Sequence, residues 1–515
     1  MQLPGLSIEF TALAAPLPVW HARVDAAQWL AAAQAMRDSG ARLLALWAGA
    51  ADAQAQPSAC VAYASAQGAC WLTLPLADGA TYPDLVPFFP VVARMQRAAA
   101  DLSGIRAEGA QDQRAWLNHG AWPEDYRPLR APGTRHPTPT PLQDYDFVRV
   151  EGDGVHEIPV GPVHAGIIEP GHFRFSIVGE KVLRLEQRLG YTHKGIEQRI
   201  SQLPPVAAAK LAGRVSGDSS VAYAWAYCMA LESAAQTPVP ERGLWLRALL
   251  LERERIANHL GDLGALGNDA AFAFGLAQFS RLREDWLRVS HELFGHRWLM
   301  DRIVPGGVAV DLDGAGADRL RRQCNAIEDE VRTLFRIYES HAGLQDRFMS
   351  TGRVPPQLAA QLGLTGLAGR ASGQARDLRC DHAWPPYAQI GVTQARHAGG
   401  DVAARVAVRF DEVFESLRLI RRLLDAMPAG PIACEVVLPQ QAAMGAGWVE
   451  GWRGEIWVAL ELADAKSGKR IRRCHLHDPS WQNWPVLEHA IMGNIVPDFP
   501  LINKSFNLSY SGQDL

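Results

Sequence analysis

The sequence lacks any pair of cysteines close enough together to form a local metal or disulfide site. Its seven thiols stand at Cys60, Cys70, Cys228, Cys324, Cys380, Cys434 and Cys474, and no two lie closer than ten positions. A zinc or iron–sulfur cage needs clustered thiolates, and an odd number of scattered thiols is typical of a reducing compartment. We therefore expect a cytoplasmic chain without disulfides and without a local cysteine cage.

The sequence also lacks long apolar runs, a signal peptide and an excess of basic residues. No stretch approaches the ~20 apolar residues of a membrane span, and the start of the chain has no basic segment followed by an apolar one. The 51 Lys and Arg residues face 55 Asp and Glu residues, which gives a formal net charge of −4. This balance argues against a general nucleic-acid binder. Any membrane association would have to come through other subunits.

Several common catalytic and cofactor motifs are missing as well. The sequence contains no G-x-G-x-x-G after a predicted strand, no Walker A loop, no G-x-S-x-G elbow and no H-E-x-x-H helix. Hypotheses of a nucleotide-binding domain, a serine hydrolase or a zinc protease therefore have no motif to support them.

The residues that are present predict two domains joined by a linker. Residues 1–130 predict a small α+β domain, with a helix after Asp25 whose inner face is Trp29, Leu30, Ala33 and Met36. Residues 131–146 are rich in proline, which can continue neither a helix nor a strand ladder, and predict the linker. Residues 147–515 predict a mainly helical domain.

Apolar residues recur at helical spacing in two long segments of the second domain, Leu320–Leu334 and Val402–Leu424. Each segment presents one apolar stripe, so we expect a helix bundle in which nearly all of these positions only pack the core. Alternating residues predict strands at Phe173–Ile177 and Ile456–Leu462. The predicted fold class is α+β: a small α+β domain followed by a mainly α-helical bundle domain with peripheral β-hairpins.

Two places carry polar residues that could perform chemistry. His164 and His172 lie in a Gly- and Pro-rich loop, where hydrogen-bonded loop histidines are the more common interpretation. His193 and Glu197 would share one face of a helix. A buried carboxylate there could relay protons, and a solvent-exposed pair is an equal alternative.

Two further clusters favour structural interpretations. Arg253, Arg255, Asn258 and His259 stand beside the apolar stripe of a predicted helix, where structural hydrogen bonds are the usual role. The run Cys474–Asp478 would put two histidines on one strand face. Two ligands without a second cluster argue against a metal site.

A series of motifs follows one another along most of the chain. They are Gly161–His164 with Pro170–Phe175, His193–Glu197, Glu254–Ile256 with Asn258–Leu260, Pro305–Val308, Arg370–Gly373 with Asp377–Arg379, Glu450–Gly451 with Arg453–Glu455, Asn483–Pro485 and Pro500–Ile502. In these the second domain resembles the large subunit of energy-converting NiFe hydrogenases of the formate-hydrogenlyase type. It also resembles the related large peripheral-arm subunit of respiratory complex I.

The first domain is similar to the smaller complex I subunit that partners the large one. The similarity rests on Asp101–Ile105, Glu108–Gly109, Trp122–Tyr126 and Pro128–Arg130. Fusion of the two domains in this order is typical of formate-hydrogenlyase large subunits. The resemblance implies the NiFe hydrogenase large-subunit fold for residues 147–515.

The metal-binding segments of the hydrogenase family are altered in this sequence. The family holds nickel and iron with an R-x-C-G-x-C and a D-P-C-x-x-C segment, and the four thiolate positions here are Ser216, Ser219, Ser509 and Gly512. A serine hydroxyl is a hard oxygen and glycine has no side chain, whereas nickel–iron ligation needs thiolates. We therefore expect no NiFe centre, no metal and no hydrogenase activity.

Complex I also lacks these cysteines, and the resemblance implies a quinone pocket in that branch. The tyrosine that meets the quinone head group aligns with Gly217, so the usual donor is missing. His164 and His172 remain in the quinone-contacting loop, Glu197 keeps the family's proton-relay position, and Asp218 makes the former metal cavity polar. These four residues are the candidate proton or quinone-pocket groups. No cofactor is expected on this chain itself.

The resemblance implies a subunit of a membrane-associated, complex-I-like or hydrogenase-related oxidoreductase complex that couples electron transfer to ion translocation without its own NiFe centre. The whole complex would then fall among NADH:quinone oxidoreductases, with NAD binding and quinone binding. Expected partners are an iron–sulfur small subunit, antiporter-like membrane subunits and a ferredoxin-like subunit. These would hold the chain on the inner face of the bacterial cytoplasmic membrane.

One alternative is a non-catalytic scaffold or coupling subunit of an antiporter-like membrane complex. Another is a binding module for an unrelated ligand, which has only the polar cavity in its favour. Whether the chain itself catalyses a reaction therefore stays open at this point.

Overall fold

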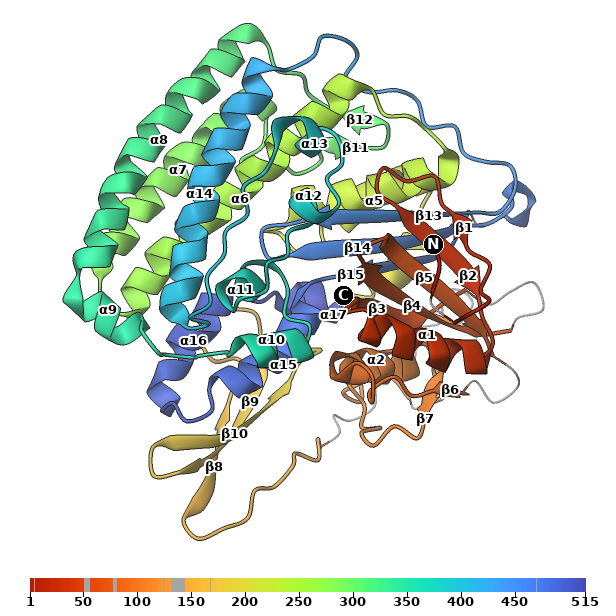
Figure 1. Ribbon diagram of the computed structural model, residues 1–515, viewed down its shortest axis with the longest axis horizontal. Coiled ribbons are helices and arrows are strands. Elements are labelled where there is room, and N and C mark those ends of the chain that lie inside the picture. The colour runs from red at the N-terminus through yellow and green to blue at the C-terminus, as the bar shows by residue number, and fades with distance from the viewer. Residues whose placement is uncertain are drawn as a thin grey trace.

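The computed structural model of the chain describes residues 1–3, 5–50, 56–76, 81–123, 125–130, 144–166, 168–468 and 470–515. Most of the predicted linker, residues 131–143, lies outside the described residues. Within the described ranges, an N-terminal sheet with its helices packs beside a larger helical unit, and a small sheet projects at the bottom of the view (Figure 1). This arrangement confirms the predicted α+β class with a mainly helical second part.

The N-terminal unit alternates strands and helices. Its elements are β1 (Thr11–Ala12), β2 (Val19–Arg23), α1 (Ala26–Asp38), β3 (Arg42–Ala48), β4 (Ser58–Ser65), β5 (Gly68–Pro75), β6 (Thr81–Pro83), η1 (Pro90–Val92), α2 (Ala93–Ser103) and β7 (Arg106–Glu108).

Helix α1 begins where the sequence predicts it. The Asp25 side chain accepts a hydrogen bond from the Gln28 backbone amide at 2.8 Å, and the Gln28 side chain accepts one from the Asp25 amide at 3.1 Å. This reciprocal capping fixes the first turn. The predicted inner face is confirmed for Trp29 and Met36 but wrong for Leu30, which is exposed. Leu30 follows Trp29 by one position and points about 100° away around the helix.

The N-terminal sheet is buried on both faces. In the described residues its strands run in the order β1–β2–β5–β4–β3. Val61 and Leu72 face the core that α1 and α2 cover, whereas Trp47 and Trp71 join the core of the larger unit. Burial on both faces explains why β4 and β5 read as continuous apolar runs. The two units therefore pack against each other through the sheet.

In its described residues, the larger unit contains most of the helices and three small sheets. Its strands are β8 (Val155–Val160), β9 (His172–Val178), β10 (Lys181–Arg188), β11 (Ile303–Val304), β12 (Gly307–Val308), β13 (Ala443–Glu450), β14 (Glu455–Leu462) and β15 (Ile471–His477). Its helices are α3 (Ile196–Ile200), α4 (Pro205–Ala212), α5 (Ser220–Ala235), α6 (Glu241–Asp269), α7 (Ala273–Phe294), α8 (Gly314–Ser340), α9 (Ala342–Phe348), α10 (Pro356–Gln361), α11 (Gly366–Ala371), α12 (Leu378–Asp381), α13 (Tyr387–Ile390), α14 (Val402–Asp425), η2 (Ala465–Ser467), α15 (Ser480–Ala490), η3 (Val496–Asp498), α16 (Phe499–Phe506) and α17 (Tyr510–Asp514).

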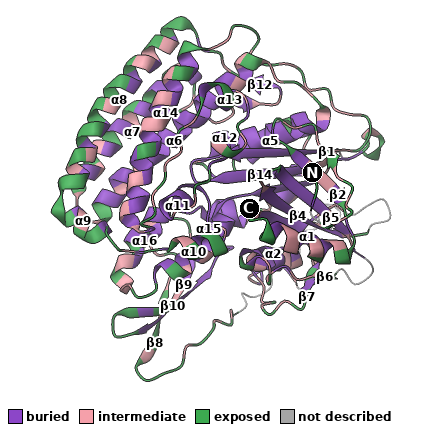
Figure 2. Cartoon of the chain, viewed as in Figure 1, coloured by how far each residue is buried: buried purple, intermediate pink, exposed green. Residues whose placement is uncertain are grey.

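Four long helices, α6, α7, α8 and α14, lie side by side as the predicted bundle (Figure 1). The apolar stripe of α8, from Leu320 to Leu334, is buried, and the outward faces of α7 and α8 are exposed (Figure 2). Among the described helices, none combines the length and the hydropathy that crossing a membrane requires.

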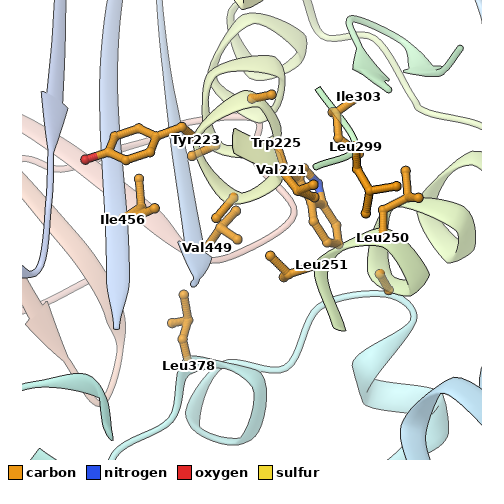
Figure 3. Packing of buried hydrophobic residues seen from close by; sticks show 14 of the residues in the cluster. Val221, Tyr223, Trp225, Leu250, Leu251, Leu299, Ile303, Leu378, Val449 and Ile456 are labelled. Atoms are coloured by element: carbon orange, nitrogen blue, oxygen red, sulfur yellow. The ribbon is translucent and has the colours of Figure 1, made fainter. Parts of the chain in front are cut away.

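Helix α5 is buried on nearly all sides because it packs directly on β13. Gly447 and Gly445 make this close approach possible, since a Cβ at Gly447 would lie 1.8 Å from the Ala226 carbonyl oxygen. On the other side of α5, Trp225 packs with Leu250 and Leu251 of α6, while the Tyr223 hydroxyl points away from this cluster (Figure 3). Tyr223 therefore extends from the apolar core to a polar region, where its hydroxyl contacts Asp478.

Candidate functional site

The four positions at which the resemblance places metal thiolates come together in one polar cluster. Ser216 and Ser219 stand in the short segment between α4 and α5, and Ser509 caps α17 by accepting a hydrogen bond from the Gly512 amide at 2.9 Å. The hydroxyl oxygens of Ser216 and Ser509 lie 3.0 Å apart. Two segments that are far apart in sequence thus meet here, because the two serines are separated by 293 positions.

Asp218 and Arg453 form the charged centre of this cluster. Arg453, from the tight turn between β13 and β14, contacts both Asp218 carboxylate oxygens, at 2.7 and 2.5 Å. Ser216 donates a hydrogen bond to Asp218 at 2.7 Å, and Ser219 donates one at 3.2 Å. Burial alone would raise the pKa of Asp218, but the guanidinium and the hydrogen bonds lower it to about 2. Asp218 is therefore a fixed anion that is already neutralised.

Asp478 fills the space that a side chain at position 512 would need. A Cβ built on Gly512 would lie 2.4 Å from Asp478 Oδ2. Tyr223 donates a hydrogen bond to the same oxygen at 2.6 Å, and the Ser480 amide donates one to Oδ1 at 2.7 Å. The absence of a side chain at Gly512 is thus matched by a carboxylate held in its place.

The side chains of this cluster do not suit the nickel–iron centre that the resemblance implies for the family. Its members are hydroxyls, carboxylates and a guanidinium that are bonded to one another, and thiolate ligands are absent from the four positions. In the part of the chain that the structure describes, no group of three or more His, Cys, Asp or Glu side chains is arranged to hold a metal ion.

Glu197 lies apart from this cluster, on the first turn of α3. Its carboxylate contacts His475 Nδ1 at 2.7 Å and accepts a hydrogen bond from Arg473 at 3.0 Å, and both partners stand on β15. Burial would raise the pKa of Glu197, but Arg473 and His475 lower it to about 2. The predicted solvent-exposed alternative is wrong, because only 5% of Glu197 is exposed.

The predicted helical pairing of His193 with Glu197 is wrong. Gly195 has a φ of 66°, and α3 begins only at Ile196, so His193 lies before the helix. Its Nδ1 contacts the Asp514 backbone oxygen at 2.7 Å instead.

The two loop histidines make hydrogen bonds within their own loop. His164 Nδ1 lies 3.2 Å from the Pro162 carbonyl oxygen, and His172 Nδ1 lies 3.3 Å from that of Gly161. Burial lowers the pKa of His172. The His164 ring stands at the edge of Phe173 and 6.4 Å from the Tyr510 ring, measured between centroids.

The four candidate residues thus occupy different surroundings. Asp218 belongs to the serine cluster, Glu197 belongs to the seam with the N-terminal sheet, and the two histidines belong to the loop before β9. Tyr510 connects two of these places, because it follows Ser509 in sequence and its ring lies near His164.

Sequence reasoning missed three partners that complete these sites: Asp478, Tyr223 and Arg473. Asp478 and Arg473 flank the Cys–His–Leu–His run that draws attention as a metal motif. That run was therefore a signal, because His475 and Asp478 take part in the hydrogen bonds of these sites.

The polar residues on α6 make structural hydrogen bonds, as their pattern predicts. Arg253 donates to the Trp286 carbonyl at 3.0 Å, and Arg255 donates to that of Glu450 at 2.8 Å. Asn258 reaches the serine cluster through the Asp218 carbonyl, at 2.7 Å. His259 Nε2 lies 2.7 Å from a carboxylate oxygen of α14.

Comparison with known proteins agrees with this architecture. The family model of the respiratory-chain NADH dehydrogenase 49 kDa subunit matches residues 267–448, and that of the 30 kDa subunit matches residues 22–134. Formate hydrogenlyase subunit 5 of Escherichia coli is 31% identical over 456 residues, covering 86% of this chain and 79% of that protein. Hydrogenase-4 component G of Escherichia coli is 32% identical over 453 residues, covering 86% and 78%.

A solved structure shares the fold. A chain of the membrane-bound sulfane sulfur reductase, an archaeal respiratory membrane complex, superposes with a TM-score of 0.65 at 24% identity, covering 70% of this chain and 99% of that one. Given these similarities and the joined 30 kDa and 49 kDa modules, the chain belongs to the family of formate-hydrogenlyase and hydrogenase-4 large subunits related to respiratory-chain NADH dehydrogenase.

Proposed function

We propose that this chain is the large subunit of a membrane-associated oxidoreductase complex of the hydrogenase and complex I type, that the complex couples electron transfer to ion translocation, and that this subunit carries no NiFe centre. Its relatives are named as components of formate hydrogenlyase and hydrogenase-4. The observation that carries the proposal is the cluster of Ser216, Ser219, Ser509 and Gly512, which Asp218, Arg453 and Asp478 fill.

The chemistry of the cluster opposes a soft divalent metal in two ways. The hydroxyls already donate to Asp218 or accept from a backbone amide, so they are not poised as ligands. A guanidinium contacts Ser219 at 3.3 Å and Asp218 at 2.5 Å. A fixed positive charge at such a distance in a buried site repels a cation much more strongly than it would in water.

The expected neighbours of the chain belong to the same proposal. They are an iron–sulfur small subunit, antiporter-like membrane subunits and a ferredoxin-like subunit, which would hold this chain at the inner face of the cytoplasmic membrane. In this proposal, those partners anchor the chain at the membrane.

Nickel analysis of the purified complex tests the metal part of the proposal. The complex is isolated through a tag on this chain, and nickel is measured by elemental analysis against protein. We expect no nickel above the level of a preparation from cells that lack the tagged gene. One nickel per chain would overturn the proposal.

Quinone binding at the loop of His164 and His172 is a further part of the proposal. Gly217 stands where complex I has a tyrosine, and a Cβ at Gly217 would meet no atom within 4 Å. Gly217→Tyr therefore starts from a position where a Cβ is accommodated, and it supplies the hydroxyl that the resemblance implies. We expect this variant to raise the rate of quinone reduction by the complex, with Gly217→Phe as the control that lacks the hydroxyl.

A scaffold role without catalysis is the second candidate, and the serine cluster favours it because its polar groups are bonded to one another. Glu197→Gln distinguishes the two candidates, with Glu180→Gln in the exposed β9–β10 turn as the matched control. Loss of dye-linked electron transfer in an intact Glu197→Gln complex supports a redox role. Unchanged turnover in an intact complex supports the scaffold.

A further inference from the structure

A small cavity lies in the seam between the N-terminal sheet and β15. Its volume is about 30 Å³, and β3, α2, α3 and β15 contribute to its wall. Most of the wall is apolar, with Leu46, Met95, Ala99 and Leu102 on the N-terminal side. A cavity of this volume has room for one water molecule.

Three rings in this wall carry a buried nitrogen without a hydrogen-bond partner. They are Trp47 Nε1, Trp481 Nε1 and His475 Nε2. His475 is only 7% exposed, and Trp47 stacks on it with ring centroids 4.7 Å apart and planes at 10°. Buried polar atoms are almost always paired, either with protein or with ordered water, so three unpaired nitrogens around one cavity point to an occupant.

The contact with Glu197 determines whether His475 Nε2 donates or accepts a hydrogen bond. Glu197 is ionised, and its oxygen lies 2.7 Å from His475 Nδ1, so Nδ1 carries the proton and donates it. Burial lowers the pKa of His475, which keeps the ring neutral. His475 Nε2 is therefore an acceptor, whereas the two indole N–H groups are donors.

Water matches this combination better than other small ligands. A water molecule can donate a hydrogen bond to His475 Nε2 and accept one from an indole N–H. A cation would meet the Arg473 guanidinium, which also lines the cavity, and no group of three or more His, Cys, Asp or Glu side chains among the described residues is arranged to hold a metal ion. An apolar atom would leave all three nitrogens unpaired.

We propose that this cavity holds an ordered water molecule bonded to His475 Nε2, and that His475 passes protons between this water and Glu197. The second part rests on the proposed function of the complex. A proton that arrives on the water moves to Nε2, while the Nδ1 proton moves to Glu197 Oε1. The ring stays neutral in its other tautomer, the carboxylate becomes a carboxylic acid, and the reverse transfer restores both.

The charged and titratable groups around His475 are consistent with this relay. Arg473 pairs with Glu197 and with the Ala48 and Cys474 carbonyls. His477 is buried, and its Nε2 contacts Gln482 at 3.0 Å. Asp514 also lines the cavity, while the α2 side contributes apolar side chains and Ser103 but no titratable group. His475 is thus a positioning residue and a proton carrier for Glu197.

The first experiment determines a structure of the intact complex at a resolution that shows water. We expect one water peak within hydrogen-bond distance of His475 Nε2. Crystals under xenon pressure provide the opposing test, because a dry apolar cavity takes up xenon. Xenon in the cavity, or no water peak at Nε2, overturns the water site.

The second experiment fills the cavity from α2. Ala99→Leu places a larger side chain into it, and Ala100→Leu is the control, because Ala100 is the next residue on the same helix and does not line the cavity. We expect Ala99→Leu to shift the ¹⁵N resonance of His475 Nε2 and to lower proton-coupled turnover about tenfold, with a changed solvent isotope effect. Ala100→Leu should do neither.

Trp47→Phe is the second variant, in case Ala99→Leu does not fold. It keeps the stacked ring but removes the indole donor, and it should weaken the water peak. A water peak together with unchanged turnover and isotope effect in both variants would overturn the relay and leave the proposed function standing. A wild-type complex without redox turnover would instead overturn the proposed function, while the water site is still decided by the structure.

Discussion

At the scale of single residues, Gly512 and Asp478 close one of the four positions at which the resemblance places a metal-binding thiolate. The other three positions hold serine, which differs from cysteine in one atom. Asp478 occupies the volume beside Gly512, with Oδ2 2.4 Å from where a Cβ would stand. Cysteine at all four positions would therefore not by itself build a thiolate site, because the carboxylate blocks one of them.

Gly512→Cys should accordingly destabilise the chain, by about 1–3 kcal/mol as expected for overpacking of a core. Gly217→Ala is the control in the same cluster, because a Cβ there meets no atom within 4 Å. Urea unfolding midpoints measure both. Equal midpoints for the two variants would show that Asp478 moves aside freely.

The Asp218–Arg453 pair should make stability depend on acid pH. The pKa of Asp218 is lowered to about 2, so its ionised form stabilises the fold above the ordinary pKa of an aspartate, and this contribution is lost as the pH falls toward 2. Asp218→Asn should cost about 3–5 kcal/mol at pH 7, because it leaves a buried guanidinium unpaired.

Urea unfolding at pH 7 and pH 3 measures this effect, and the loss caused by Asp218→Asn should be smaller at pH 3. The double variant Asp218→Asn with Arg453→Met should recover much of the loss, since it removes both charges. An identical loss at both pH values would contradict the ion-pair explanation.

The sequence located the serine positions and Glu197 through motifs, but it could not reveal their partners. Tyr223 and Asp478 are 255 positions apart, and Glu197 and His475 are 278 apart. Nothing local marks such pairs, because only the packing of α3 against β15, and of α5 against the neighbouring strands β13 and β14, brings them together. Motif reading therefore identifies the residues of a site better than it identifies their hydrogen bonds.

At the scale of elements, α6 and α14 are joined by ion pairs deep in the bundle. Glu412 of α14 accepts a hydrogen bond from Arg370 at 2.7 Å and lies 2.7 Å from His259 Nε2 and 3.6 Å from Arg255. Despite burial, the arginines and His259 hold the pKa of Glu412 well below its usual range. One carboxylate thus balances cations from α6 and α11.

Glu412→Gln should lower the free energy of unfolding by about 3–5 kcal/mol, because it removes a buried carboxylate that balances the buried cations Arg370 and Arg255. Asp411→Asn is the matched control, because Asp411 is the preceding residue on α14 and pairs with His397 at the surface. Such an exposed pair contributes about 0–1 kcal/mol. Thermal unfolding of the two variants should therefore differ clearly, and similar midpoints would argue against the network.

The helices differed in how well their sequences predicted them. The α8 and α14 patterns show one apolar stripe because each helix has one exposed side. Helix α5 is buried on nearly all sides, and its run of apolar and small residues carries no such periodicity. Burial on all sides removes the signal on which helix prediction rests.

At the scale of the whole molecule, the pH range of greatest stability depends on two groups of buried acids. In one group the pKa is raised by burial, and in the other it is lowered by ion pairs. Burial raises the pKa of Glu254 to about 8 and that of Asp514 to about 7. Each binds a proton more tightly in the folded chain than in the unfolded chain, so stability falls as the pH rises from the ordinary carboxyl pKa through these values.

We therefore expect the unfolding temperature to be highest near pH 5, between this loss and the loss of the Asp218 and Glu197 ion pairs in acid. Glu254→Gln mimics the protonated side chain and should reduce the decline between pH 5 and pH 8. Calorimetry across pH 3–9 measures both. An unfolding temperature that rises steadily to pH 8 would contradict this assignment of the buried acids.

The seam between the two units has a consequence for synthesis. Arg473 of β15 donates a hydrogen bond to the Ala48 carbonyl of β3, 425 positions earlier in the chain. At ribosomal rates of about 5–20 residues per second, β3 waits about 20–85 s for this partner. During that time Trp47 and the rest of its face stay uncovered while the nascent chain grows. Chaperone occupancy on ribosome-bound chains should therefore begin once β3 has emerged and end only after β15 has emerged.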